Sequence, residues 1–194
     1  MKQFSILFFA LAALTLAFTG PVETVAVDTS DSVISWKGYK VLGSHEGTLN
    51  LTNGDLQMQD GALVGGSFVI DMGSINCTDL DGEAKGNLEG HLKSADFFGV
   101  EKHPTATFDI TNVVSRGTAG SYKITGDLTI KETTKAVRFN VQISEENGQQ
   151  VATGEVQIDR SDFDVRYGSG SFFDNLGDKT IYDEFDLGIR LVLN

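Results

Sequence analysis

The chain has 194 residues, a formal net charge of −12 and a sequence pI of about 4.5. A negative field of this size disfavours nucleic acid and anionic membrane surfaces as partners, and the sequence contains no basic patch with interleaved aromatic residues. Cys77 is the single cysteine, so an internal disulfide bond is excluded. No His or Lys flanks this thiol to activate it, so we expect Cys77 to be a small buried apolar residue.

The first residues predict a signal peptide. Lys2 supplies a positive charge, and residues 4–18 are almost wholly apolar. This run is too short for a comfortable membrane span and has the length of a signal-peptide core. We therefore assign residues 1–19 to a cleaved signal peptide, with an uncleaved anchor as the alternative. Residues 20–194 then form one exported domain, periplasmic or secreted, with no stable membrane insertion.

Strand signals dominate residues 20–194. The sequence has 22 glycines and only 2 prolines, so Gly, Asn and Asp are expected to make the turns. Turn signals recur about every ten residues, which is typical of an all-β barrel or sandwich. They lie at residues 53–55, 60–61, 117–120 and 147–148.

The first half of the domain predicts strands of irregular pattern. The best matches are residues 33–39, 47–52, 55–59 and 63–71, with a turn at residues 53–55. Trp36 and Tyr39, at the end of the first of these strands, are candidates for contacts at the rim of a barrel.

Residues 83–95 break the strand pattern and predict a short helix. Leu88, Leu92 and Ala95 recur at helical spacing, with polar residues between them. Two glycines inside the segment each cost about 1 kcal/mol relative to alanine. We therefore expect this helix to require tertiary packing.

The second half of the domain alternates regularly between apolar and polar residues. One face of each strand is apolar and the other is polar and faces solvent, as expected for antiparallel strands around a single interior. With the earlier strands, this predicts about eight strands in one domain. The alternating segments are residues 106–111, 124–130, 137–143, 152–158 and 185–193.

Three segments carry a family resemblance. The first is His91–Phe108, which combines a helix, a Phe-Phe pair, a turn at Pro104 and a strand. The second is Gly126–Lys131 with Thr134–Val137 after it, and the third is Asp159–Phe163 with Tyr167–Gly170 after it. In their combination, order and spacing, residues 27–194 resemble the YceI-like family, carriers of polyisoprenoid lipids in the bacterial envelope.

The chain departs from that family pattern at three positions. Glu132 and Ala136 stand where relatives often have Gly and Pro, which affects the expected turn after Lys131. His103 stands where an aromatic residue is usual. The resemblance implies an extended eight-stranded antiparallel lipocalin-like barrel, with a short helix between strands and an elongated apolar cavity for an isoprenoid chain. It implies no catalytic residues and does not identify the headgroup of the ligand.

A barrel of eight strands can be filled by its own side chains or can hold one small ligand. Alternation alone does not distinguish these two states. If the barrel is hollow, the inward apolar residues are expected to line the cavity. They are Phe108, Ile110, Leu128, Ile130, Val137, Phe139, Val141, Val156, Ile158, Leu187, Ile189 and Leu191.

The charge pattern predicts an uncharged ligand headgroup. A five-carbon isoprenoid unit contributes roughly 4 kcal/mol before ordering costs, so a few units reach micromolar affinity without a strong polar contact. A pyrophosphate would meet a repulsive field unless a cluster of Lys and Arg residues overrode it. Basic residues near the family motifs alternate with acidic ones, so we expect a quinone or a free isoprenoid. These residues are Lys93, Lys102, Arg160 and Arg166, interspersed with Asp96, Glu101, Asp162 and Asp164.

The predicted helix and the Phe-Phe pair have two alternative roles. Leu88, Leu92, Phe97 and Phe98 are expected either to form a lid over the cavity mouth or to plug a barrel end as ordinary core.

Weaker patterns predict neither a metal site nor a cofactor. His45, His91 and His103 form no closely spaced pair, and residues 79–83 lack the ligand series of a calcium loop. Residues 168–171 are expected to form a mobile loop near a barrel rim. Asp162 and Asp164 would share the solvated face of a strand.

The sequence leaves three classes of function. The first is a non-enzymatic binding protein that sequesters or transports an isoprenoid or similar amphiphile. The second is a structural or partner-binding envelope protein with a filled barrel. The third is an enzyme, which the sequence favours least because it contains no nucleophile–base set. Whether the chain forms a homodimer stays open.

Overall fold

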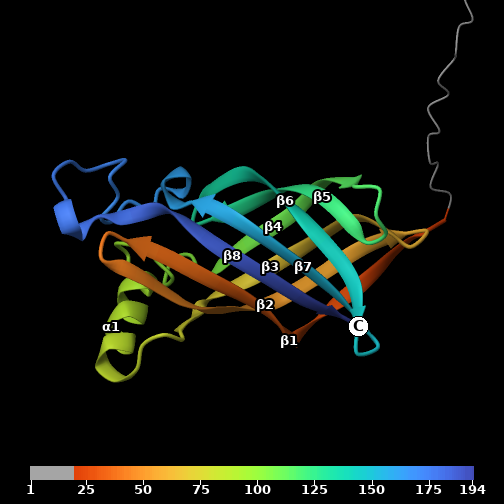
Figure 1. Ribbon diagram of the computed structural model, residues 1–194, viewed down its shortest axis with the longest axis horizontal. Helices are drawn as coiled ribbons and strands as arrows, with labels where there is room; N and C mark the ends of the chain where they lie inside the picture. The colour runs from red at the N-terminus through yellow and green to blue at the C-terminus, as the bar shows by residue number, and fades with distance from the viewer. Residues whose placement is uncertain (1–19) are drawn as a thin grey trace, which may run out of the picture.

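The computed structural model describes residues 20–194, and the predicted signal peptide at residues 1–19 lies outside the described residues. The described residues form eight strands, one α-helix and two short 3-10 helices (Figure 1). The elements are β1 (Val22–Lys40), β2 (Gly43–Gln59), β3 (Ala62–Cys77), α1 (Gly82–Lys93), β4 (Thr105–Ser115), β5 (Ser121–Ile130), β6 (Thr133–Glu146), β7 (Gln149–Asp159), η1 (Arg160–Phe163), η2 (Gly177–Lys179) and β8 (Ile181–Leu193).

The strands form a closed barrel in sequence order. Each strand pairs antiparallel with the next, and β8 returns to pair with β1, for example at Trp36 and Leu187. Closure removes the free sheet edges that would otherwise expose unpaired backbone groups. The predicted all-β fold, an eight-stranded antiparallel barrel with one short helix between strands, is confirmed.

The turn expected at residues 53–55 was wrong, because β2 runs unbroken through this segment. A register shift against β3 between Leu51 and Asn53 absorbs the irregularity as a bulge. A Cβ atom on Gly54 would lie 2.9 Å from Cδ1 of Phe68, so this glycine permits close packing inside the strand. The true hairpin turn is at Asp60 and Gly61, whose φ angles are both positive.

The helix α1 lies within two residues of its predicted bounds. None of its residues is fully buried, and polar contacts attach it to the end of β3. The Lys85 ammonium donates to Asn76 Oδ1 over 2.8 Å, and the Glu89 carboxylate accepts the Cys77 amide over 2.8 Å. The helix, weakened by its two glycines, is therefore stabilised partly by polar contacts with the rest of the fold.

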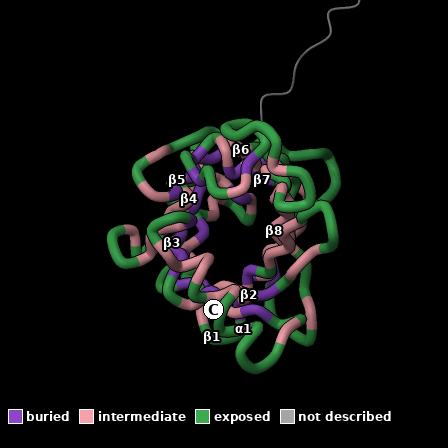
Figure 2. The backbone as a smooth tube through the Cα atoms, turned by 90° about the vertical axis from the view of Figure 1, so that its left-hand side faces the viewer, coloured by how far each residue is buried: buried purple, intermediate pink, exposed green. Residues whose placement is uncertain are grey.

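The two ends of the barrel differ. At the end opposite α1, the buried side chains of Leu63, Tyr122 and Leu193 close the interior, and the Leu63 amide donates to the Tyr122 hydroxyl. The other end carries α1, the β1–β2 turn and the loop before β8 (Figure 1). Figure 2, viewed from this end, places the buried residues mainly on the barrel strands. Within residues 20–194, no helix has both the length and the apolar character needed to cross a bilayer.

Candidate ligand-binding cavity

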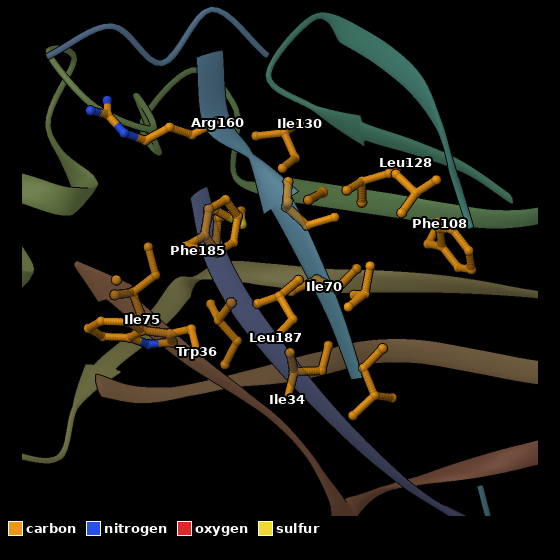
Figure 3. Close-up of a pocket in the computed structure, with 18 of the residues that line it drawn as sticks. Ile34, Trp36, Ile70, Ile75, Phe108, Leu128, Ile130, Arg160, Phe185 and Leu187 are labelled. Carbon is orange, nitrogen blue, oxygen red and sulfur yellow. The ribbon is translucent and has the colours of Figure 1, made fainter. Parts of the chain in front are cut away.

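A cavity of about 330 Å³ lies inside the barrel, lined by side chains from all eight strands and from α1. Its volume falls at the lower end of the range of small-molecule sites, about 300–1,000 Å³. Figure 3 shows apolar side chains from several strands pointing toward a common interior, with Arg160 at one side.

The twelve residues expected on the cavity wall all lie on it. They are Phe108, Ile110, Leu128, Ile130, Val137, Phe139, Val141, Val156, Ile158, Leu187, Ile189 and Leu191. Alternation therefore assigned the inward face of β4 to β8 correctly, whereas contact of these residues with a ligand stays a prediction.

Several cavity-lining residues of β6, β7 and β8 are only half-buried. Val137, Phe139, Val156 and Ile189 belong to the interior face, yet each keeps part of its surface accessible. Interior side chains keep accessible surface where they face a cavity, because close packing removes it elsewhere. The opposite wall is densely packed, with Leu51, Leu56, Phe68 and Ile70 buried.

A row of three aromatic rings crosses the cavity wall. The Phe108 ring centroid lies 6.4 Å from that of Phe68 and 5.6 Å from that of Phe139. A Cβ atom on the inward-facing Gly126 would lie 2.3 Å from Cζ of Phe108, so the missing side chain makes room for the ring. Glycine at an inward position of an alternating strand was the sequence signal for this packing.

The β1–β3 part of the wall was missed apart from Trp36 and Tyr39. Its lining residues include Ile34, Leu49, Leu51, Leu56, Leu63, Phe68, Ile70, Met72 and Ile75. Register shifts in β2 change which residues face inward, so strict alternation fails there. In β3 the alternating Phe68, Ile70 and Met72 carried a usable signal, which Val69 on the outer face obscured.

The polar residues of the cavity wall gather at the α1 end. They include Tyr39, Lys40, His45, His91, Arg160 and Tyr182. The rest of the wall is almost entirely apolar, so the cavity has one polar end and a long apolar body.

Arg160 fixes the structure of this polar end. Its guanidinium donates to the backbone carbonyls of Val165, Ile181 and Tyr182 and lies 3.2 Å from Asp183 Oδ1. The side chains of Arg160 and Asp183 are only 3% and 11% exposed. Burial lowers the pKa of Arg160, and the neighbouring carboxylates of Asp183 and Asp159 oppose that shift. This charge is therefore already paired and hydrogen-bonded.

The glycine-rich segment at residues 168–171 is anchored at the barrel rim. Asp183 Oδ2 accepts hydrogen bonds from the hydroxyls of Ser169 and Ser171, at 2.9 and 2.6 Å. Ser169 is completely buried. The position near the rim agrees with the prediction, and these contacts tie Ser169 and Ser171 to Asp183, whereas the mobility of the loop stays a prediction.

Asp162 and Asp164 do not share a strand face, as the sequence had suggested. Asp162 lies in η1 and is 3.5 Å from Lys135, whereas Asp164 ends η1 in a left-handed conformation and pairs with Arg166. The strand ends at Asp159, whose side chain accepts the Ser161 amide and starts the helical turn.

The six residues expected at the lid or rim all line the cavity: Trp36, Tyr39, Leu88, Leu92, Phe97 and Phe98. Phe97 is buried beneath Arg160, whose Cζ lies 5.3 Å from the ring centroid. Phe98 is half-buried beside it, with ring centroids 5.0 Å apart. The Tyr39 hydroxyl donates to Asp186 Oδ2 over 2.5 Å, and this hydrogen bond raises the pKa of Tyr39.

Two buried nitrogens at the polar end lack hydrogen-bond partners among residues 20–194. They are Nε1 of Trp36 and Nε2 of His91, both on residues that line the cavity. The His91 ring packs edge-on against Phe97 and Tyr167. A buried donor without an acceptor costs about 1–3 kcal/mol, so the indole N–H of Trp36 marks a place where a ligand acceptor would be favourable.

Asp79 ties the β1–β2 side of the mouth to the segment that leads into α1. Its carboxylate accepts from the Cys77 thiol at 3.1 Å and the Glu46 amide at 3.1 Å, and it lies 2.9 Å from His45 Nδ1. Burial alone would raise the Asp79 pKa, but these contacts outweigh it and hold the pKa well below its usual value. Burial also raises the pKa of the completely buried Cys77 thiol.

We expect Asp79→Asn to lower the free energy of unfolding by about 1 kcal/mol near neutral pH. A carboxyl whose pKa is depressed by folding stabilises the protein above its unfolded pKa of about 3.9, and this stabilisation is lost as the pH falls through the folded value. In urea unfolding, the free energies of unfolding of wild type and Asp79→Asn should therefore become more similar below about pH 4. Asp81→Asn is the matched control because Asp81 makes no side-chain cap bond. A difference independent of pH would contradict this account.

The sequence matches a family model and several curated proteins. The model of the YceI-like domain family matches residues 26–193. A UPF0312 protein of Vibrio cholerae serotype O1 is 26% identical over 176 residues, covering 84% of this chain and 89% of that protein. A UPF0312 protein of Ectopseudomonas mendocina is 55% identical over 47 residues, which is 24% of each chain.

Solved structures share the barrel. Burkholderia cenocepacia BcnA superposes with a TM-score of 0.71 at 23% identity, covering 87% of this chain and 99% of that chain. A polyisoprenoid binding domain from Saccharophagus degradans gives a TM-score of 0.62 at 12% identity, covering 88% and 97%. At these identities the likeness establishes the fold. Because the family model spans almost all of the described residues, the chain belongs to the YceI-like family.

Proposed function

We propose that the protein binds an isoprenoid lipid or similar amphiphile in the barrel cavity and sequesters or carries it without chemical change. The observation that supports this most directly is the cavity of about 330 Å³ inside the barrel, apolar along its body and polar only at the α1 end. Family membership and the barrel shared with a polyisoprenoid binding domain agree with this proposal. Residues 1–19 support export, so we place the protein in the periplasm or outside the cell.

Lipid loading can be measured directly. Native mass spectrometry of the full chain, purified from bacteria, should show a bound species of defined mass that organic extraction recovers as a lipid. An empty protein that also takes up no isoprenoid quinone from detergent would instead favour a structural or partner-binding role. Turnover of the bound lipid that a single polar substitution abolishes would indicate an enzyme.

We infer that the lipid lies with its head at the α1 end and its tail toward Leu63. The end at Leu63 and Tyr122 is closed by buried side chains, whereas the α1 end carries the polar groups. The buried Arg160 is already paired with Asp183, and among the described cavity-lining residues Lys40 is the single Lys or Arg outside an ion pair, which is too little to balance a pyrophosphate. An uncharged head such as a quinone therefore fits better than a pyrophosphate.

We expect a quinone to outcompete an isoprenoid pyrophosphate of equal chain length in a displacement assay. A quinone carbonyl would accept from Trp36 Nε1, so Trp36→Phe should weaken quinone binding by about 2–10-fold. The same substitution should leave binding of a saturated hydrocarbon unchanged, because it retains an aromatic ring. A pyrophosphate that wins the competition, or equal losses for quinone and hydrocarbon, would contradict the neutral-head assignment.

We expect Phe98→Ala to weaken lipid binding more than it lowers stability, because the half-buried Phe98 faces the cavity mouth. Phe97→Ala is the matched comparison. Phe97 is buried beneath Arg160, and its loss should cost about 3–5 kcal/mol of unfolding free energy. Isothermal lipid titration and urea unfolding of both variants separate these effects. Parallel losses of affinity and stability in Phe98→Ala would assign Phe98 to a plug and not to a lid.

A further inference from the structure

Large apolar side chains are exposed around the polar end of the cavity. Six of the eight exposed large hydrophobic residues among residues 20–194 lie there. We define them as the rim patch: Val41, Leu42, Tyr167, Phe172, Phe173 and Tyr182. Leu42 is 73% exposed and Phe173 is 50% exposed. The patch comes from the β1–β2 turn, the loop between η1 and η2, and the start of β8, which lie at the α1 end of the barrel (Figure 1).

The rim patch is held in place by hydrogen bonds. The Val41 amide donates to the Thr180 carbonyl over 3.3 Å, which joins the β1–β2 turn to the segment before β8. The amides of Phe172 and Phe173 both donate to the Ser169 carbonyl. Ser169 is in turn buried against Asp183. The backbone that carries these exposed side chains is therefore held by hydrogen bonds, so little conformational entropy is lost when the patch binds a surface.

The rim patch is continuous with the cavity. Tyr182 is both exposed and part of the cavity wall. The ring centroids of Tyr167 and His91 lie 4.4 Å apart, and His91 lines the cavity. An apolar surface placed at the mouth of an apolar cavity suits the passage of an apolar molecule.

The charge around the rim patch differs from that of the whole chain. Residues 40–43 and 164–182 contain three basic residues, Lys40, Arg166 and Lys179, and three acidic residues, Asp164, Asp174 and Asp178, so their net charge is 0. The chain as a whole carries −12. Lys40 and Lys179 flank the patch and form none of the ion pairs seen within residues 20–194, so they can face lipid phosphates. The rest of the protein is repelled by an anionic bilayer, which favours approach by this end.

We propose that the rim patch docks the barrel mouth onto the surface of a lipid bilayer. This proposal rests on the proposed lipid-binding function, because a long isoprenoid tail crosses water only at a large cost for every exposed methylene. If the cavity mouth contacts the bilayer surface, the isoprenoid tail can pass from the apolar bilayer interior into the apolar cavity without crossing water. Tyrosine and phenylalanine on loop tips are suited to the membrane interface, where such side chains bury their rings and leave polar groups wet.

The test is sedimentation with vesicles of phosphatidylethanolamine and phosphatidylglycerol. The full domain should bind them, and Leu42→Glu combined with Phe173→Glu should lower the binding by at least about tenfold, because two buried apolar contacts are replaced by charges. Neither residue lines the cavity. Val114→Glu is the matched control, since Val114 is 52% exposed but lies outside the patch. Equal vesicle binding by wild type and the rim variant would overturn the proposal.

A second measurement separates this proposal from lipid binding itself. Loading with an isoprenoid quinone from detergent should be the same in wild type and the rim variant, whereas transfer of that quinone from vesicles should be slower in the variant. If the wild type takes up no quinone, the proposed function is contradicted. If wild type and the rim variant load normally and transfer the quinone at equal rates, only the docking is contradicted. A wild-type dimer that the rim variant converts to monomers, without vesicle binding, would assign the patch to a contact between two copies.

Discussion

Arg160→Met is expected to lower the free energy of unfolding by about 3–5 kcal/mol, because it leaves the Asp183 carboxylate buried without its partner. The substitution also removes the hydrogen bonds to the carbonyls of Val165, Ile181 and Tyr182. These bonds hold η1, the following loop and β8 together at the cavity mouth. Equilibrium unfolding in urea measures the loss.

The double variant Arg160→Met with Asp183→Leu distinguishes an unpaired charge from lost packing. Replacing both members of a buried ion pair by apolar residues is often nearly neutral, so the double variant should lose less stability than Arg160→Met alone. Lys37→Met is a surface control, because the exposed Lys37–Glu46 pair should contribute no more than about 1 kcal/mol. A loss below about 1 kcal/mol for Arg160→Met would show that Arg160 does not fix the mouth.

Val156→Trp is expected to lower lipid affinity by about 100-fold or more. Val156 is a half-buried residue that lines the cavity from β7, and an indole there would occupy space that a lipid tail needs. Excluding one five-carbon unit removes roughly 4 kcal/mol of apolar burial, and each 1.4 kcal/mol corresponds to tenfold in affinity. Lipid titration followed by native mass spectrometry measures the change.

The matched control for Val156→Trp is Glu155→Trp, one residue away on the outer face of the same strand. It adds the same side chain and should leave lipid affinity within about twofold, because it lies outside the cavity. Thermal unfolding should show both variants folded, since an indole placed in empty space strains the core less than one placed in a packed core. Equal lipid binding by Val156→Trp and wild type would place the lipid elsewhere.

Sequence patterning predicted the second half of the barrel better than the first. From β4 to β8 the cavity-lining side chains alternate regularly, because the register shift between β4 and β5 lies beyond Ile110. A period of two residues was therefore enough to place residues such as Phe139 and Ile189. In β2 and β3 the bulges near Asn53 and Gly73 change which residues face inward, and the sequence does not mark where alternation resumes.

The polar end of the cavity was the least predictable part of the site. Arg160 was recognised only as one charge among others, because its pairing with Asp183 depends on β8 returning beside η1. The same long-range contact orders Ser169 and Ser171, whose glycine-rich segment suggests mobility when taken alone. The rim patch depends on two loops that are far apart in sequence, which the bond between Val41 and Thr180 brings together.

The most direct test of the central claim is the electron density inside the barrel of the purified, unmodified protein. A crystal structure should show continuous elongated density along β6, β7 and β8, with its polar end near Trp36 and Arg160. A barrel interior filled by its own side chains, with Val156 and Ile189 in close contact with the opposite wall, would contradict it.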